Sequence, residues 1–186
     1  MDDSIESRMP TPDFFVIGAP KCGTTALHRW LGEHPEVFVG TKEIHFFGRD
    51  LDHRRPELDE MTYRAFFDAA QASHKCIGEV AVWYLMSESA PEEIHRFAPG
   101  AKIIVMLRRP DEMLYSLHSQ LLYSGEEDIE DFQAALDAEA DRAAGRRIPT
   151  SSHQGSEVPP TECLQYGRVA SFAPGIARYQ ELFGAD

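Results

Sequence analysis

Three classes of protein are excluded by what this chain of 186 residues has little of. Its three cysteines, Cys22, Cys76 and Cys163, fit neither a disulfide framework nor a metal-site spacing, so we expect a reducing compartment, the cytoplasm. No apolar run approaches the roughly 18 residues of a membrane helix, and none follows the acidic start as in a signal peptide. Basic residues are scarce: 18 Lys and Arg against 31 Asp and Glu give a net charge of −13, which argues against nucleic acid or a membrane surface as a partner.

What is present is the composition of a folded domain with its basic residues gathered in one part. A hydrophobic fraction of 42% is enough for a sizeable core and excludes a disordered chain. Through Pro110 the chain has 13 basic and 17 acidic residues (−4), whereas the remainder has 5 and 14 (−9). An anion would therefore bind within the first part.

Short apolar runs alternate with segments of helical periodicity. The apolar runs predict buried strands at 14–18, 76–82 and 102–107. Apolar spacings of three and four residues predict helices at 24–34, 63–72, 91–97 and 110–123. This alternation predicts an α/β fold, with a central parallel sheet flanked by helices. We assign residues 12–186 to this single domain and expect a flexible N-terminus at 1–11.

The last third of the chain is predicted to be helical and acidic. Residues 129–144 indicate an exposed acidic helix that Gly145 closes, and the Ser- and Pro-rich composition predicts a loop at 145–163. The segment 164–183 has a helical pattern that Pro174 must break or kink.

The segment GAPKCGTT, from Gly18 to Thr25, joins the first strand to the first helix. Gly23 allows close backbone approach, Thr24 and Thr25 offer hydroxyl donors, and Lys21 adds positive charge, which together suit a phosphate group. The spacing of the two glycines follows the P-loop pattern, but Thr24 stands where that pattern has lysine. This departure disfavours an ATPase or GTPase, and an ordinary strand-to-helix turn is the alternative.

The stretch PKCGTTAL after a buried strand resembles the 5′-phosphosulfate loop of the sulfotransferases that use 3′-phosphoadenosine 5′-phosphosulfate (PAPS). The resemblance implies a three-layer fold like that of P-loop kinases, PAPS as donor, adenosine 3′,5′-bisphosphate as product, and no metal. It places Lys21, Cys22, Gly23, Thr24 and Thr25 around the cofactor, with Lys21 at the leaving phosphate oxygen. The neighbouring lysine would lower the pKa of the Cys22 thiol.

A second anion site is indicated by IIVMLRRPDEMLYSL. Arg108 follows the strand at its carboxyl end, where ligands bind in open α/β sheets, and Ser116 lies eight residues further on. In the family, an arginine and a serine at this spacing bind the 3′-phosphate of the cofactor. The alternative is a polar strand exit with a serine on a solvated helix face.

Transfer of a sulfuryl group also requires a base for the acceptor, and TKEIHFF places Lys42, Glu43 and His45 together. In heparan-type and many bacterial sulfotransferases a similar segment supplies a catalytic glutamate, which matches Glu43, with His45 as the second candidate. Some relatives have an acidic residue five positions after this glutamate, where this chain has Gly48. A polar loop with a satisfied salt bridge is the alternative.

The stretch GEVAVWYL resembles a substrate-side segment of the same family. Val80 stands where some relatives have a lysine, and Trp83 and Tyr84 remain candidates for packing against an acceptor, or simply for core packing. The resemblance weakens after Leu121, and ELFGAD resembles the point before a further core strand, so we expect the domain to be truncated at its C-terminus.

The sequence as a whole predicts a PAPS-dependent sulfotransferase that acts on a hydroxyl or amine of a carbohydrate, lipid or small metabolite. The alternatives are a P-loop kinase-like protein using ATP, and a non-catalytic remnant of the sulfotransferase fold. We expect the acceptor to be the partner, without nucleic acid and without a membrane span. The sequence gives no signal for an oligomeric state.

Overall fold

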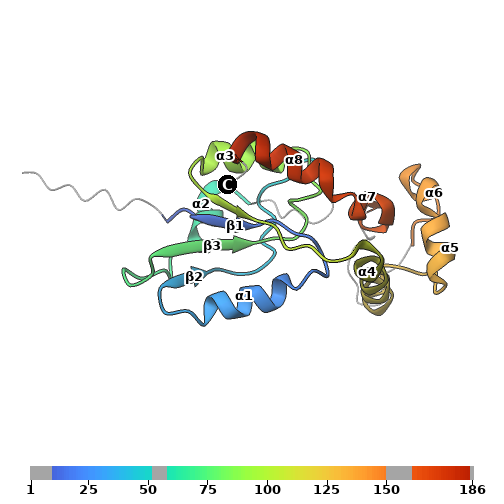
Figure 1. The fold of residues 1–186 in the computed structure, drawn as a ribbon, viewed down its shortest axis with the longest axis horizontal. Helices are drawn as coiled ribbons and strands as arrows, with labels where there is room; N and C mark the ends of the chain where they lie inside the picture. The colour runs from blue at the N-terminus through green and yellow to red at the C-terminus, as the bar shows by residue number, and fades with distance from the viewer. Residues whose placement is uncertain (1–9, 52–57, 150–160, 185–186) are drawn as a thin grey trace, which may run out of the picture.

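The computed structural model describes residues 10–51, 58–149 and 161–184. Its centre is a parallel sheet of four strands in the order β2-β3-β1-β4, which confirms the predicted fold class (Figure 1). The strands are β1 (Phe14–Val16), β2 (Val37–Val39), β3 (Cys76–Val80) and β4 (Lys102–Ile104). All four run in one direction, so their carboxyl ends meet at one edge of the sheet.

Helices cover both faces of the sheet. Helix α1 (Thr24–Gly32) lies on one face, while α3 (Ala90–Phe97) and α8 (Phe172–Phe183) lie on the other (Figure 1). The short α2 (Glu60–Ala65) packs its Tyr63 into the same core as α3. The side chains of β1 alternate between the two layers: Phe14 and Val16 pack with Leu27 of α1, whereas Phe15 belongs to the larger core.

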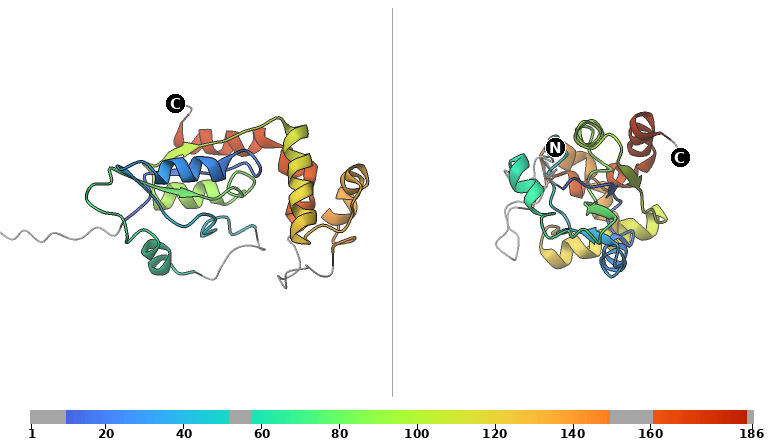
Figure 2. Two further views of the ribbon diagram at one scale, coloured as in Figure 1. Left: turned by 90° about the horizontal axis from the view of Figure 1, so that it is seen from below. Right: turned by 90° about the vertical axis from the view of Figure 1, so that its left-hand side faces the viewer.

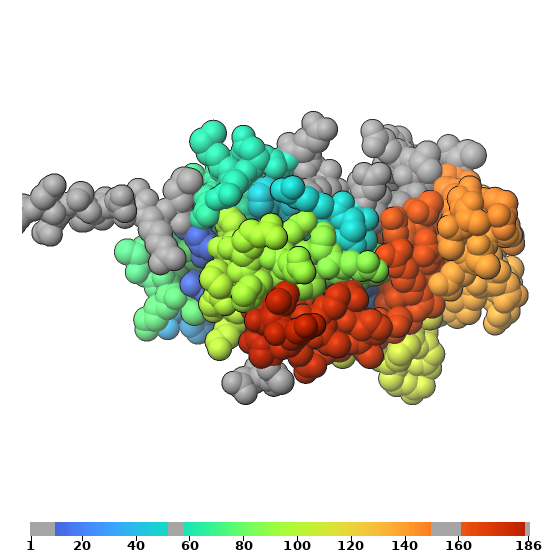
Figure 3. Space-filling model, turned by 90° about the horizontal axis from the view of Figure 1, so that it is seen from above, coloured from blue at the N-terminus to red at the C-terminus, as the bar shows by residue number. Residues whose placement is uncertain are grey.

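A second group of helices lies beyond the carboxyl ends of the strands. Helix α4 (Pro110–Ser124) stands across the direction of α1 and α8, and α5 (Phe132–Asp137) and α6 (Glu139–Ala143) follow it (Figure 2). A 3₁₀ helix (Thr161–Leu164) and α7 (Tyr166–Ala170) complete the group. Figure 3 shows α7 between α8 and the pair formed by α5 and α6.

Several predicted elements need correction. The strand β2 was not predicted, and the helix expected at 63–72 is α2, which ends at Ala65. The exposed acidic helix expected at 129–144 is two short helices, in which Arg142 is fully buried because it pairs with the buried carboxylate of Glu127. The break in the last segment lies at Ser171, and Pro174 sits in the first turn of α8, where a missing N–H removes no helical hydrogen bond.

Two boundary predictions fall partly outside the described residues. Of the N-terminus expected to be flexible, residues 1–9 lie outside, and the hydroxyl of Thr11 accepts a hydrogen bond from Arg64 Nη1 at 2.8 Å. Of the loop expected at 145–163, residues 150–160 lie outside, and Thr161 already belongs to the 3₁₀ helix. Within the described ranges, no helix has the length and apolar character needed to cross a membrane.

Candidate active site

The loop from Gly18 to Thr25 carries the chain from the end of β1 into α1. Lys21 (φ 58°) and Gly23 (φ 84°) both adopt left-handed backbone conformations, which turn the loop sharply back toward the helix. Gly23 is the N-cap residue of α1 and has no side chain, so no side chain caps the first N–H groups of this nine-residue helix. The loop therefore presents uncapped backbone donors and a lysine at one place, as anion binding requires.

A cavity of about 430 Å³ opens in front of this loop, between the carboxyl end of the sheet and α4. It brings together residues from three segments of the chain that the sequence analysis considered separately. From the predicted set it is lined by Lys21, Gly23, Thr24, Thr25, Lys42, Glu43, His45 and Trp83. The phosphate loop and the predicted base are thus in a single cavity.

Glu43 is held by the end of β3. Its backbone N–H donates to the carbonyl of Val80 at 2.8 Å, and its Oε2 accepts from the backbone N–H of Val82 at 3.1 Å. The same carboxylate forms an ion pair with Lys42, and its Oε2 lies 3.4 Å from Nε2 of His45. The carboxylate is thus oriented by the strand end and retains an accessible surface facing the cavity.

The fifth position after Glu43, where some relatives have an acidic residue, is Gly48. Gly48 donates its N–H to Glu93 Oε2 at 2.8 Å, and the next acidic residue, Asp50, accepts hydrogen bonds from Ser87, Glu88 and Ser89 before α3. Asp50 therefore serves the start of α3 rather than the cavity. The arrangement at the cavity is a Glu–His pair with a neighbouring lysine.

Two lining residues from the acidic part of the chain were not predicted. The ammonium group of Lys21 donates to the side-chain oxygen of Gln120 on α4, and Glu126 also lines the cavity. Gln120 is three residues after Leu117 and one before Leu121, both of which line the same cavity. Their helical spacing places Gln120 on one face of α4 with them, and this is the sequence signal that could have located it.

The two aromatic residues of GEVAVWYL separate in the structure. Trp83 lines the cavity, whereas Tyr84 is buried behind it and donates its hydroxyl to Glu79 Oε1 at 2.6 Å. Only 6% of Trp83 is exposed, so both aromatic residues belong mainly to the core, and Trp83 alone reaches the cavity lining.

The remaining predicted residues lie outside the cavity lining. Cys22 is buried, and burial raises the pKa of its thiol despite a hydrogen bond from the backbone of Arg108, so the expected lowering by Lys21 is wrong. Arg108 follows β4 beside the loop and pairs with Glu112 at 2.8 Å. Ser116 is partly exposed on α4. Neither Arg108, whose backbone contacts Cys22 of the loop, nor Ser116 lines the cavity.

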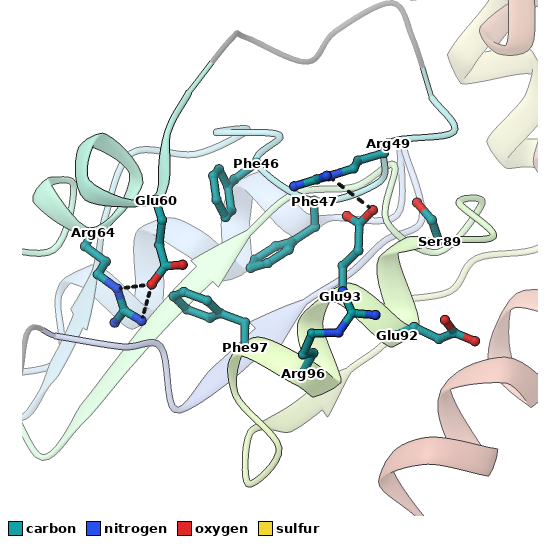
Figure 4. Close-up of a pocket in the computed structure, with 10 residues that line it drawn as sticks. All are labelled: Phe46, Phe47, Arg49, Glu60, Arg64, Ser89, Glu92, Glu93, Arg96 and Phe97. Carbon is teal, nitrogen blue, oxygen red and sulfur yellow. Dashed lines mark hydrogen bonds and ion pairs between the residues drawn. The ribbon is translucent and has the colours of Figure 1, made fainter.

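A second cavity of about 480 Å³ lies on the other side of the loop that carries Glu43 (Figure 4). Its floor is formed by Phe46, Phe47 and Phe97. Three arginines, three glutamates and Ser89 line the rest, and two of the arginines are paired, Arg64 with Glu60 and Arg49 with Glu93. No residue of the predicted site lines this cavity.

The fold is that of an α/β protein whose first helix begins, beside Lys21, without a side-chain cap. The sequence profile of the Sulfotransferase family matches residues 12–167, and the chain belongs to this family. A crystal structure of a sulfotransferase from Alicyclobacillus acidocaldarius superimposes with a TM-score of 0.76 at 28% identity, covering 94% of this chain and 70% of that one.

Curated relatives are similar over part of the chain. The bifunctional heparan sulfate N-deacetylase/N-sulfotransferase 3 of Homo sapiens is 34% identical over 112 residues, and the carbohydrate sulfotransferase 15 of Mus musculus is 33% identical over 147. Each match covers 56% of this chain, and 12% and 26% of the two relatives respectively. The similarity therefore concerns one segment of those longer proteins.

Proposed function

We propose that this chain transfers a sulfuryl group from PAPS to a hydroxyl or amine of an acceptor. The observation that carries the proposal is the single cavity in which Lys21 of the phosphate loop and the carboxylate of Glu43 both lie. A donor anion and the base that activates its acceptor must meet in one place, and membership of the Sulfotransferase family supports this assignment.

The loop suits the phosphosulfate end of PAPS. The uncapped N–H groups at the start of α1, the ammonium of Lys21 and the hydroxyls of Thr24 and Thr25 are the donors that an anion of this kind needs. Arg108 and Ser116 are proposed to hold the 3′-phosphate, with the guanidinium exchanging its partner Glu112 for the ligand. The small, buried Cys22 allows the loop to pack closely on β4.

Each charged side chain has a proposed role in the transfer. When bound, PAPS supplies the sulfuryl group, and the S–O bond to its phosphate breaks as the acceptor's bond to sulfur forms. Glu43 accepts the proton that the acceptor hydroxyl or amine loses in this step. Lys21 stabilises the negative charge that develops on the leaving phosphate oxygen. Lys42 pairs with Glu43 and lines the cavity, so its positive charge is proposed to lie on the acceptor side.

His45 is the second candidate for the base. Its Nε2 lies 3.4 Å from Glu43 Oε2, so either group can take the proton directly or through the other. We favour Glu43, because two hydrogen bonds to β3 and the following residues fix its backbone and its carboxylate. If His45 takes the proton instead, its imidazolium places a positive charge near the donor anion.

We propose a carbohydrate as the acceptor class. Relatives of this chain are named as heparan sulfate and carbohydrate sulfotransferases, and this similarity is what supports the choice; Trp83, 6% exposed, is the aromatic residue at the cavity. The cytoplasmic location and the absence of a nucleic-acid partner stay predictions from the composition.

Radiolabelled transfer from [³⁵S]PAPS to a panel of neutral and anionic oligosaccharides tests the proposal. We expect Glu43→Gln to lower kcat by about 10²- to 10⁴-fold, and Lys21→Ala by about 10²- to 10³-fold. Glu88→Gln and Lys102→Ala serve as matched controls, since both side chains are exposed and neither lines the cavity. Full activity in both Glu43→Gln and Lys21→Ala would show that the site is wrongly assigned.

A further inference from the structure

A buried carboxylate lies directly behind the proposed active site. Glu79 on β3 has 1% of its surface exposed and accepts hydrogen bonds from two tyrosine hydroxyls, one on Tyr63 of α2 and one on Tyr84 after β3. Among the described residues no lysine, arginine or histidine forms an ion pair with it. Burying a carboxylate at this depth without a neighbouring cation costs free energy. The retention of this carboxylate and its two tyrosine partners therefore calls for an explanation.

The tyrosines connect this carboxylate to the loop that carries Glu43 and His45. The backbone N–H of Phe47 donates to the hydroxyl of Tyr84 at 3.3 Å, and the same hydroxyl donates to Glu79 at 2.6 Å. At its other end the loop is tied to β3 by the bond from Glu43 N–H to the carbonyl of Val80, the neighbour of Glu79. The loop is thus anchored to one short stretch of β3 on both sides of His45.

An aromatic layer seals the carboxylate from solvent. Phe46 stacks on Tyr63 with ring centroids 4.1 Å apart, and Phe47 meets Tyr63 and Tyr84 edge-on at 5.3 and 5.8 Å. Figure 4 shows Phe46, Phe47 and Phe97 together on the floor of the second cavity, with the rings between its polar rim and the core. Water therefore has no direct route to Glu79 from that side.

This environment brings the titration of the carboxyl into the neutral range. The pKa of Glu79 is raised to about 7, because burial and, to a smaller extent, the charge of Glu43 outweigh the hydrogen bonds from Tyr63 and Tyr84, which lower it. Both tyrosines stay protonated donors, because burial and the charge of Glu79 raise the pKa of each well above the ordinary value. The titratable groups that face Glu79 are Tyr63 on α2, Tyr84 and Glu43 in the loops, and Tyr179 on α8.

We propose that Glu79 is a positioning residue for the loop that carries the base. With the carboxylate ionised, the single O–H proton of Tyr84 is committed to Glu79, and the tyrosine oxygen is left to accept from Phe47 N–H. When the acid is protonated, it becomes a donor that competes with Phe47 for the same oxygen, and the anchor weakens. The catalytic meaning of this anchor rests on the proposed role of Glu43, whereas the hydrogen-bond chain itself does not.

The anchor can be observed without substrate by following backbone amide shifts of the whole chain from pH 5 to 9 by NMR. We expect the Phe47 amide to shift with an inflection near pH 7, and Glu79→Gln to abolish that inflection. Tyr84→Phe should abolish the inflection as well, because it removes the hydroxyl that joins Phe47 N–H to Glu79. Tyr63→Phe is the matched control: it removes a bond to the same carboxylate but keeps the link, so the inflection stays and moves to higher pH.

His45 is a second ionisable group in the same loop, so His45→Gln separates the two sources of a pH effect at Phe47. An inflection at Phe47 that survives in Glu79→Gln, or that vanishes only in His45→Gln, would overturn the proposal. In the transfer assay, Tyr84→Phe should lower kcat about tenfold or more with the KM for PAPS unchanged, and Tyr63→Phe should lower kcat less. Absence of the Phe47 inflection in the unsubstituted chain contradicts the anchor. Presence of the inflection without any transfer activity contradicts only the proposed function.

Discussion

Two buried glutamates, Glu79 in the sheet and Glu127 before α5, have different partners. Glu127, before α5, accepts from both terminal nitrogens of Arg142 at 2.7 and 2.5 Å and from the hydroxyl of Tyr166 at 2.8 Å. Glu79, behind the candidate site, has two tyrosine hydroxyls and no guanidinium. Both carboxylates are out of water, and they differ in that Glu127 has a guanidinium and the backbone N–H groups of Asp128 and Ile129 as further donors.

The consequence of these further donors is seen in opposite pKa shifts. Burial acts to raise the pKa of Glu127, but the hydrogen bonds from Arg142, the backbone and Tyr166 outweigh it, and the net shift is downward. For Glu79 burial prevails, and its pKa rises to about 7. The helical end of the molecule is thus clamped by a permanent ion pair, whereas the support of the site contains a carboxyl that changes charge near neutral pH.

Removal of the guanidinium should give the largest effect on stability. Arg142→Met leaves the carboxylate of Glu127 buried without its cation, and we expect a loss of about 3–5 kcal/mol in the free energy of unfolding. Denaturant titration followed by circular dichroism measures it. Arg146→Met is the matched control, because Arg146 pairs with Asp141 at the surface, with 65% of its side chain exposed, and should change stability little. Equal effects of the two variants would contradict the clamp.

The pH dependence of stability should have opposite signs for the two glutamates. Because the pKa of Glu79 is raised on folding, the unfolded chain releases its proton first, and stability falls by up to about 3 kcal/mol as the pH rises from about 4.5 to 7. The pKa of Glu127 is lowered, so its contribution is present above the unfolded value and is lost as the pH falls through the folded one.

Unfolding titrations of Glu79→Gln and Glu127→Gln at several pH values between 4 and 8 measure both slopes. Relative to the unsubstituted chain, Glu79→Gln should gain stability toward high pH, and Glu127→Gln should lose most there. Each Gln substitution also changes the free energy of unfolding by an amount that does not depend on pH. This amount cancels when the slopes of the free energy of unfolding against pH are compared instead of its absolute values. Parallel slopes for the two variants would show that the two carboxylates do not differ in charge state.

The loop around Lys21 was singled out by its strand–loop–helix pattern, and Glu43 by the resemblance of its segment to sulfotransferases. The structure brings both segments to one cavity at the carboxyl edge of the parallel sheet. Partners from distant segments were not predicted: Tyr63 reaches Glu79 across 16 residues, and Arg142 reaches Glu127 across 15. In a sequence such residues have the pattern of a solvated face, because only the folded chain places the partner opposite.

The short strand β2 was missed for a different reason. Its three residues, Val37–Val39, pair with β3 at the edge of the sheet and are only partly buried. The apolar run here is limited to these three residues, whereas the runs that predicted β1 and β4 continue to Gly18 and Leu107, so this pattern was too short to be distinguished from a turn. The strand β2 is defined by its pairing with β3 rather than by the local propensity of its residues.

The central claim is that the loop before α1, with Lys21, binds a PAPS-type nucleotide. Calorimetry with adenosine 3′,5′-bisphosphate and, separately, with ATP and Mg²⁺ tests it most directly. We predict that the bisphosphate binds more tightly than ATP, and that Lys21→Ala weakens it about tenfold, or about 1.4 kcal/mol, with Lys102→Ala unchanged. Tighter binding of ATP with Mg²⁺, or equal affinity of the unsubstituted chain and Lys21→Ala for the bisphosphate, would contradict the account.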